Sequence, residues 1–84
     1  MNKSINIGNG AFIPADNIDF YVSPGSAPFR RAVTEAEEAK TLADTTCGKR
    51  TRALIFLKTG MIVKSILSTE AIASRLNKEP KASE

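Results

Sequence analysis

The feature that most constrains the fold is an apolar run, RALIFL at residues 52–57, which a short turn joins to MIVKSIL at 61–67. The first run is typical of a strand, and its apolar residues fall on both faces of an extended chain. The connecting KTG at 58–60 is typical of a tight turn, in which Gly60 is free to take a positive φ. We therefore predict an antiparallel hairpin whose first strand is central and covered on both faces.

Three shorter extended segments are predicted before this hairpin. SINI at 4–7 alternates polar and apolar residues, and GNG at 8–10 breaks it with a turn. A short extended piece follows at 11–16, where Pro14 lacks an N–H and so belongs at an edge or a strand end. NIDFYV at 17–22 predicts a half-buried strand with Ile18, Phe20 and Val22 on one face and Asn17, Asp19 and Tyr21 on the other.

Two helices are predicted. The first begins after an N-cap at Ser26, carries Pro28 in its first turn and fades at residues 40–42. Its apolar stripe consists of Phe29, Ala32, Val33 and Ala36. The second is capped by Ser68 and runs to Lys78. Leu67 and Ile72 stand at the positions of a hydrophobic staple. Glu70 lies in the first turn and Arg75 in the last, as the helix dipole prefers.

The segment between the first helix and the hairpin, ADTTCGK at 43–49, is predicted as a loop with room for one extended segment at its centre. The resulting fold class is α+β, a small antiparallel sheet with two helices.

Length and composition exclude several classes of function. With 84 residues we expect one compact domain, and with one cysteine there is no intrachain disulfide, which fits a reducing cytoplasm. We find no signal-peptide pattern, and the longest apolar run is too short to span a membrane, so we expect a cytoplasmic protein.

Catalysis and metal binding are also not expected. Without histidine there is no Ser-His or Cys-His pair, and one cysteine cannot form a zinc site. GKRT at 48–51 resembles the end of a P-loop, but Ala43 and Arg50 stand where that motif needs Gly and Ser or Thr. We therefore expect no enzyme, cofactor, metal or small-molecule substrate.

Positive charge is concentrated in one short stretch. Lys49, Arg50 and Arg52 lie within four positions with no acid among them, in a chain of net charge +3. Arginine binds phosphate in a bidentate manner, and the neighbouring threonine hydroxyls are donors of the type used on phosphates. A second pair, Arg30 and Arg31, lies at the start of the first helix. The stretch predicts an anion-binding loop. The alternative is that these are solvated charges, with Arg31 paired to Glu35.

Cys47 adjoins these cations, and cations lower the pKa of a thiol, so a reactive cysteine is one reading. We expect instead an inert, small side chain that faces the interior.

Four segments together resemble the RemA family of extracellular-matrix regulators. They are INIGNG at 5–10, VSPGSAP at 22–28 followed by RR, GKRTRA at 48–53 and STEAIASRL at 68–76, and they stand in the family's order and spacing. The resemblance covers nearly everything from Ile5 to Leu76. We therefore expect a single RemA-like domain at 1–76 and a disordered tail at 77–84.

The resemblance implies a bacterial, DNA-binding transcriptional regulator without a helix-turn-helix, with a LytTR-related fold. It implies a homo-oligomeric ring that carries double-stranded DNA around its outside. The family's G-R-R-T-R segment maps to Gly48–Arg52. The implied DNA contacts are Lys49, Arg50, Thr51 and Arg52, with Arg30 and Arg31 as weaker candidates. Ser26, Ala27 and Pro28 would lie near a subunit contact.

The sequence departs from the family pattern at four positions. Lys49 stands where the family usually has Arg, and Asn17 stands where it often has a further DNA-contacting Arg. Cys47 replaces a usual Tyr, and Asn9 replaces a usual Phe. Lysine keeps the charge but loses the bidentate geometry. These changes leave open an alternative, a structural or protein-interaction oligomer that has lost DNA binding. RNA binding ranks last, because the chain has few aromatic residues for base stacking.

Overall fold

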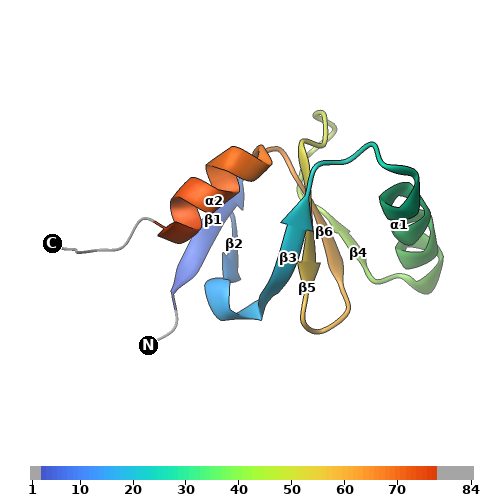
Figure 1. The fold of residues 1–84 in the computed structure, drawn as a ribbon, viewed down its shortest axis with the longest axis horizontal. Coiled ribbons are helices and arrows are strands. Elements are labelled where there is room, and N and C mark those ends of the chain that lie inside the picture. The colour runs from blue at the N-terminus through green and yellow to red at the C-terminus, as the bar shows by residue number, and fades with distance from the viewer. Residues whose placement is uncertain (1–2, 78–84) are drawn as a thin grey trace, which may run out of the picture.

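The computed structural model describes residues 3–77 and confirms an α+β fold (Figure 1). In chain order the elements are β1 (Ser4–Gly8), β2 (Ala11–Pro14), a 3₁₀ turn η1 (Ala15–Asn17), β3 (Ile18–Val22), α1 (Ala27–Ala39), β4 (Leu42–Asp44), β5 (Ala53–Leu57), β6 (Ile62–Ser65) and α2 (Thr69–Asn77).

The strands form two sheets. β1 and β2 make a two-stranded antiparallel hairpin, and the other four strands form a sheet of order β3-β5-β6-β4. The predicted hairpin is β5–β6, paired antiparallel with Ala53 opposite Ser65 and Phe56 opposite Ile62. β4 begins at Leu42 and ends at Asp44, so the extended segment predicted at the centre of residues 43–49 lies instead at their start. It pairs in parallel with β6, so one edge of this otherwise antiparallel sheet is parallel.

β5 is covered on both faces, as its sequence predicts. Ala53 and Ile55 face a core cluster that also contains Ile5, Ile7, Val63 and Ile72, beneath the β1–β2 hairpin and α2. Leu54 faces the other way, into a second cluster with Ala36 and Ile62, against which α1 packs. The two helices therefore lie at opposite ends of the molecule, with the four-stranded sheet between them (Figure 1).

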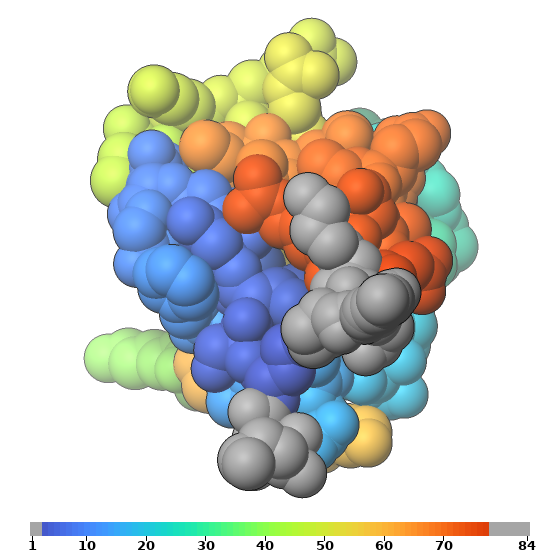
Figure 2. Space-filling view, turned by 90° about the vertical axis from the view of Figure 1, so that its left-hand side faces the viewer, coloured from blue at the N-terminus to red at the C-terminus, as the bar shows by residue number. Residues whose placement is uncertain are grey.

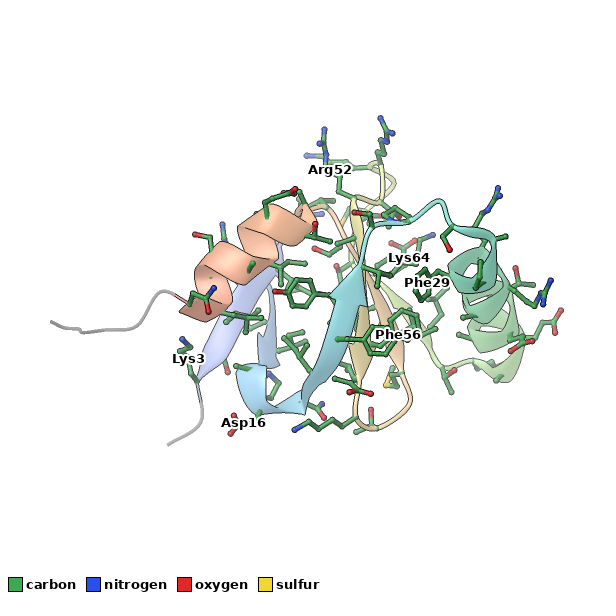
Figure 3. The ribbon with its side chains drawn as sticks, viewed as in Figure 1. Lys3, Asp16, Phe29, Arg52, Phe56 and Lys64 are labelled. Atoms are coloured by element: carbon green, nitrogen blue, oxygen red, sulfur yellow. The ribbon has the colours of Figure 1, made fainter. Side chains whose placement is uncertain are left out.

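α1 begins and packs as predicted, although its cap differs. Ser26 occupies the N-cap position, but its side chain makes no capping hydrogen bond; its backbone oxygen accepts from the N–H groups of Phe29 and Arg30 at 3.1 and 3.0 Å. The helix ends at Lys40, which takes a left-handed conformation with φ 61°. Phe29 of the predicted stripe faces Phe56 of the sheet, with the ring centroids 5.9 Å apart (Figure 3).

β3 departs from the predicted alternation. A bulge lies between Ile18 and Phe20, which pair with the consecutive residues Leu57 and Phe56. A bulge adds one unpaired residue and so shifts the faces of the residues on either side of it. Ile18 consequently packs with Tyr21 against the first cluster, and the prediction that it shares a face with Phe20 and Val22 was wrong.

α2 confirms its predicted start. The Oγ of Ser68 accepts from the N–H of Ala71 at 3.1 Å, and Leu67 packs against the same cluster as Ile72, as a hydrophobic staple requires. The helix runs to Asn77. Lys78, the predicted end of this helix, lies outside the described residues, as does the part of the tail predicted at 77–84 that follows Asn77. Neither helix in the described range is long and apolar enough to cross a membrane.

Candidate functional site

The predicted cations lie in the loop that joins β4 to β5, residues 45–52, which we call the basic loop. Lys49, Arg50 and Arg52 are exposed, and Thr51 is half-buried. The loop rises from one end of the four-stranded sheet, and Arg52 stands there away from the core (Figure 3). Within residues 3–77 none of the three cationic side chains takes part in an ion pair. Their charge is therefore available to an external anion.

The tip of the loop is a tight turn. Cys47 and Gly48 both have positive φ, 53° and 84°, and the N–H of Lys49 donates to the backbone oxygen of Thr46 at 3.0 Å. After the turn, the N–H of Arg52 donates to the backbone oxygen of Ser65 at 2.8 Å, which returns the chain to the sheet. The cations thus follow a hydrogen-bonded turn, and the bond of Arg52 to Ser65 fixes where the chain rejoins the sheet.

Thr46, at the base of the loop, is 2% exposed and bonded to Asp44, the last residue of β4. One carboxylate oxygen, Asp44 Oδ1, accepts from both the N–H and the hydroxyl of Thr46, at 2.9 and 2.6 Å. The hydroxyl bond is the main cause that lowers the pKa of Asp44 below its ordinary value of 3.8; the N–H bond and the ammonium of Lys64 act in the same direction. Asp44 is therefore ionised at neutral pH.

Thr45 ties the base of the loop to both sheets. Its N–H and its hydroxyl donate to the backbone oxygen of Lys64 on β6, at 3.2 and 2.6 Å. Its own backbone oxygen accepts from the side-chain Nδ2 of Asn9 at 2.9 Å. Asn9 belongs to the predicted GNG turn, in which all three residues have positive φ. The basic loop consequently stands against the turn of the β1–β2 hairpin (Figure 2).

Two of the predicted arginines line a surface hollow. Arg50, Thr51 and Arg52 border it on one side, and the hollow has a volume of about 260 Å³. The other lining residues are Ser23 and Pro24, which follow β3, and Ser68, which directly precedes α2. Paired arginines next to hydroxyl groups suit an anion with several acceptor oxygens, such as a phosphate.

Not every predicted site residue joins this group. Arg30 and Arg31 are exposed on α1 and do not line the hollow. In the described part of the chain Arg31 forms no ion pair with Glu35, and the alternative that the two arginines are solvated charges stays a prediction. Asn17 lies at the far end of β3, where its backbone oxygen accepts from the N–H of Lys58 at 2.8 Å. It is thus separated from the basic loop by the length of the strand.

Three other predictions concern residues near the site. Ser26, Ala27 and Pro28 are exposed at the start of α1, and their role in a subunit contact stays a prediction. Cys47 is exposed, so the prediction that it faces the interior was wrong. The physical reason is that Thr46, rather than Cys47, turns inward to Asp44, and Cys47 opens the positive-φ turn.

Sequence reasoning missed the residues that build the base of the site. The Asp-Thr-Thr segment carries a local signal, because aspartate commonly accepts from the N–H two residues later. The contact of Asn9 with Thr45 and the approach of Ser23 and Ser68 to the arginines carry no such signal, because these residues are distant in the chain. Among the residues the structure describes, no group of three His, Cys, Asp or Glu could hold a metal.

These features define a small α+β protein with one exposed, internally braced basic loop. A family model described as RemA-like, "Extracellular matrix regulatory protein A-like", matches residues 4–76, and the chain belongs to this family. The sequence is 46% identical over 72 residues to a Synechococcus elongatus protein, covering 86% of this chain and 83% of that one. It is 45% identical over 82 residues to a Bacillus cereus protein, covering 98% and 94%.

Both relatives carry the name "Putative regulatory protein". Neither these names nor the family description is that of an enzyme.

Proposed function

We propose that this protein is a cytoplasmic regulator that binds double-stranded DNA through its phosphate backbone, as a ring of identical subunits. Each subunit is a single LytTR-like domain of residues 1–76. The observation that carries the proposal is the exposed charge of Lys49, Arg50 and Arg52, which forms no ion pair within residues 3–77 and stands in a braced loop that contains no acid. The regulatory part of the proposal is supported by the family description.

The hollow beside the loop supports phosphate as the ligand group. Arg50 and Arg52 offer bidentate donors, while Thr51 and Ser23 supply short hydroxyl donors at its rim. Contacts of this kind to phosphate oxygens fix the position of a protein on the duplex without reading its base sequence. Binding should therefore follow the shape and flexibility of the duplex more than its base sequence.

A ring explains how so few cations per subunit suffice. One subunit can neutralise only a few phosphates, and log affinity changes with log salt by about −0.9 per neutralised phosphate. Repeating the same loop around a ring adds these contacts in one complex, so avidity replaces a large single interface. We expect Ser26, Ala27 and Pro28 to lie near the subunit contact.

The testing experiment measures fluorescence anisotropy of a labelled duplex of about 60 base pairs at about 50 mM and about 200 mM salt. The wild type should bind and weaken steeply with salt. Arg50→Ala with Arg52→Ala should bind more weakly, with a flatter salt dependence and an unchanged oligomer. As the control, Lys40→Asn with Lys58→Ala removes two exposed positive charges outside the loop and should have a smaller effect. Equal binding by the wild type and the loop variant would show that the site assignment is wrong.

A second candidate function, a structural or protein-interaction oligomer without DNA, has a separate observation in its favour. Phe12 is 61% exposed and Phe20, whose ring stacks on Phe56, is 42% exposed, and aromatic residues are enriched at protein interfaces. The same titration separates the two functions, because this candidate predicts no duplex binding at either salt concentration.

A further inference from the structure

Asp44, an ionised acid, stands at the foot of the loop whose proposed ligand is an anion. Its side chain is 51% exposed, and its second carboxylate oxygen, Oδ2, lies 3.8 Å from the ammonium of Lys64. On charge alone this carboxylate opposes a phosphate nearby. If Asp44 supports anion binding, it must make a stabilising contribution that outweighs the repulsion between its carboxylate and the bound phosphate.

The hydrogen bonds of Asp44 supply that contribution. Both donors of Thr46 converge on Oδ1, and the backbone oxygen of Thr46 in turn accepts from the N–H of Lys49, the first cation of the loop. A change in the position of Thr46 is thus passed directly to the turn that orients the cations.

Asn9 braces the same segment from the other sheet. Its Nδ2 donates to the backbone oxygen of Thr45, the residue directly before Thr46. With φ 55° Asn9 lies in the left-handed region, which asparagine tolerates better than most residues. The foot of the loop is therefore held on one side by Asp44 of β4 and on the other by the β1–β2 turn.

We infer that Asp44 and Asn9 are positioning residues that hold the basic loop in its anion-receiving conformation, and that Asp44 acts through its hydrogen bonds rather than its charge. The inference rests on the proposed function, because it assigns these residues to the same loop. Neither residue needs to touch the ligand.

Two substitutions at Asp44 separate hydrogen bonding from charge. Asp44→Asn removes the charge but keeps an oxygen that can accept from Thr46, as asparagine does in such turns. Asp44→Ala removes both. In the duplex titration Asp44→Asn should bind as well as the wild type or a few-fold more tightly, because a repulsive charge is gone. Asp44→Ala should bind about tenfold more weakly than Asp44→Asn, since the turn loses its brace.

Asn9→Gly provides the matching test of the second brace. Glycine accepts the positive φ without strain, so this variant removes only the bond to Thr45. It should weaken duplex binding a few-fold without lowering the melting temperature by more than a few degrees. Gly10→Asn, which places an asparagine next to the unchanged Asn9, serves as the control for altering the turn itself. Equal affinity of Asp44→Ala and Asp44→Asn, or unchanged affinity of Asn9→Gly, would overturn the corresponding assignment.

A measurement on the protein without DNA tests this inference independently of the proposed function. Hydrogen exchange of the Lys49 amide, which bonds to Thr46, should be faster in Asp44→Ala and unchanged in Asp44→Asn. If the wild type bound no duplex while this difference appeared, the DNA function would fail and the loop brace would stand. Equal exchange in both variants would overturn the brace.

Discussion

The Oγ of Ser65 on β6 donates to the backbone oxygen of Ile7 on β1 at 2.7 Å, and both residues are fully buried. The same Oγ accepts from the N–H of Leu67 at 3.0 Å. One hydroxyl thus joins the two sheets and directs the chain toward α2.

Ser65→Ala should therefore destabilise the protein. The substitution removes the hydroxyl that bonds the buried carbonyl of Ile7 and the N–H of Leu67, which costs about 1–3 kcal/mol. Urea unfolding followed by circular dichroism measures this change. Ser74→Ala, on the exposed side of α2, is the control and should change the free energy of unfolding by less than about 0.5 kcal/mol. Equal effects of the two substitutions would contradict the assigned role of Ser65.

Two glycines of the same turn should respond differently to alanine. At Gly8, with φ 106°, an added Cβ would lie 2.5 Å from Cγ1 of Ile66, whereas at Gly10, with φ 77°, it would meet no atom within 4 Å. Gly10→Ala should cost only the backbone strain, about 1–2 kcal/mol. Gly8→Ala adds overpacking of about 1–3 kcal/mol to a similar strain. In thermal unfolding Gly8→Ala should have a clearly lower melting temperature than Gly10→Ala, and the reverse order would contradict the packing at Ile66.

Lys49→Arg tests the departure from the family pattern. Arginine keeps the charge and adds bidentate donors for phosphate, so duplex affinity should rise by a few-fold while the salt dependence stays the same. Anisotropy at two salt concentrations measures both quantities. Lys40→Arg makes the same exchange outside the loop and should leave affinity unchanged. Weaker binding by Lys49→Arg would indicate that lysine at this position is required.

The hydrogen bonds of Asp44 predict a pH dependence of stability. Its pKa is lowered in the folded protein, so its contribution is present above the ordinary value of 3.8 and is lost as the pH falls below it, through the lower folded pKa. Melting temperature recorded from about pH 6 to about pH 2 should fall less for Asp44→Asn than for the wild type. Asp19→Asn removes one exposed carboxyl of β3 and should follow the wild type. Identical curves for all three proteins would contradict the prediction.

Ala27→Asp tests the proposed subunit contact. Ala27 is exposed at the first position of α1, where an aspartate suits the helix dipole and should not harm folding. If the start of α1 lies in the contact, the charge should yield smaller species in light scattering after size exclusion, with weaker duplex binding. Glu38→Asp, on the exposed face of α1, is the control. An unchanged mass of the Ala27→Asp oligomer would place the contact elsewhere.

The sequence by itself determined those elements whose cause is local. Apolar residues on both faces of β5 require cover on both sides, and Ser68 with the Leu67–Ile72 staple specifies where α2 begins. The concentration of charge at Lys49–Arg52 was likewise visible, since neighbouring residues in the chain remain neighbours in a loop.

Only the tertiary structure decided how distant segments meet. The bulge in β3 arises from pairing with β5, and the parallel addition of β4 to β6 depends on where α1 returns the chain. The bond of Asn9 to Thr45 and the approach of Ser23 and Ser68 to Arg50 and Arg52 follow from these pairings. Such contacts join residues far apart in sequence, so their geometry is set by the packing of the two sheets and not by any local pattern.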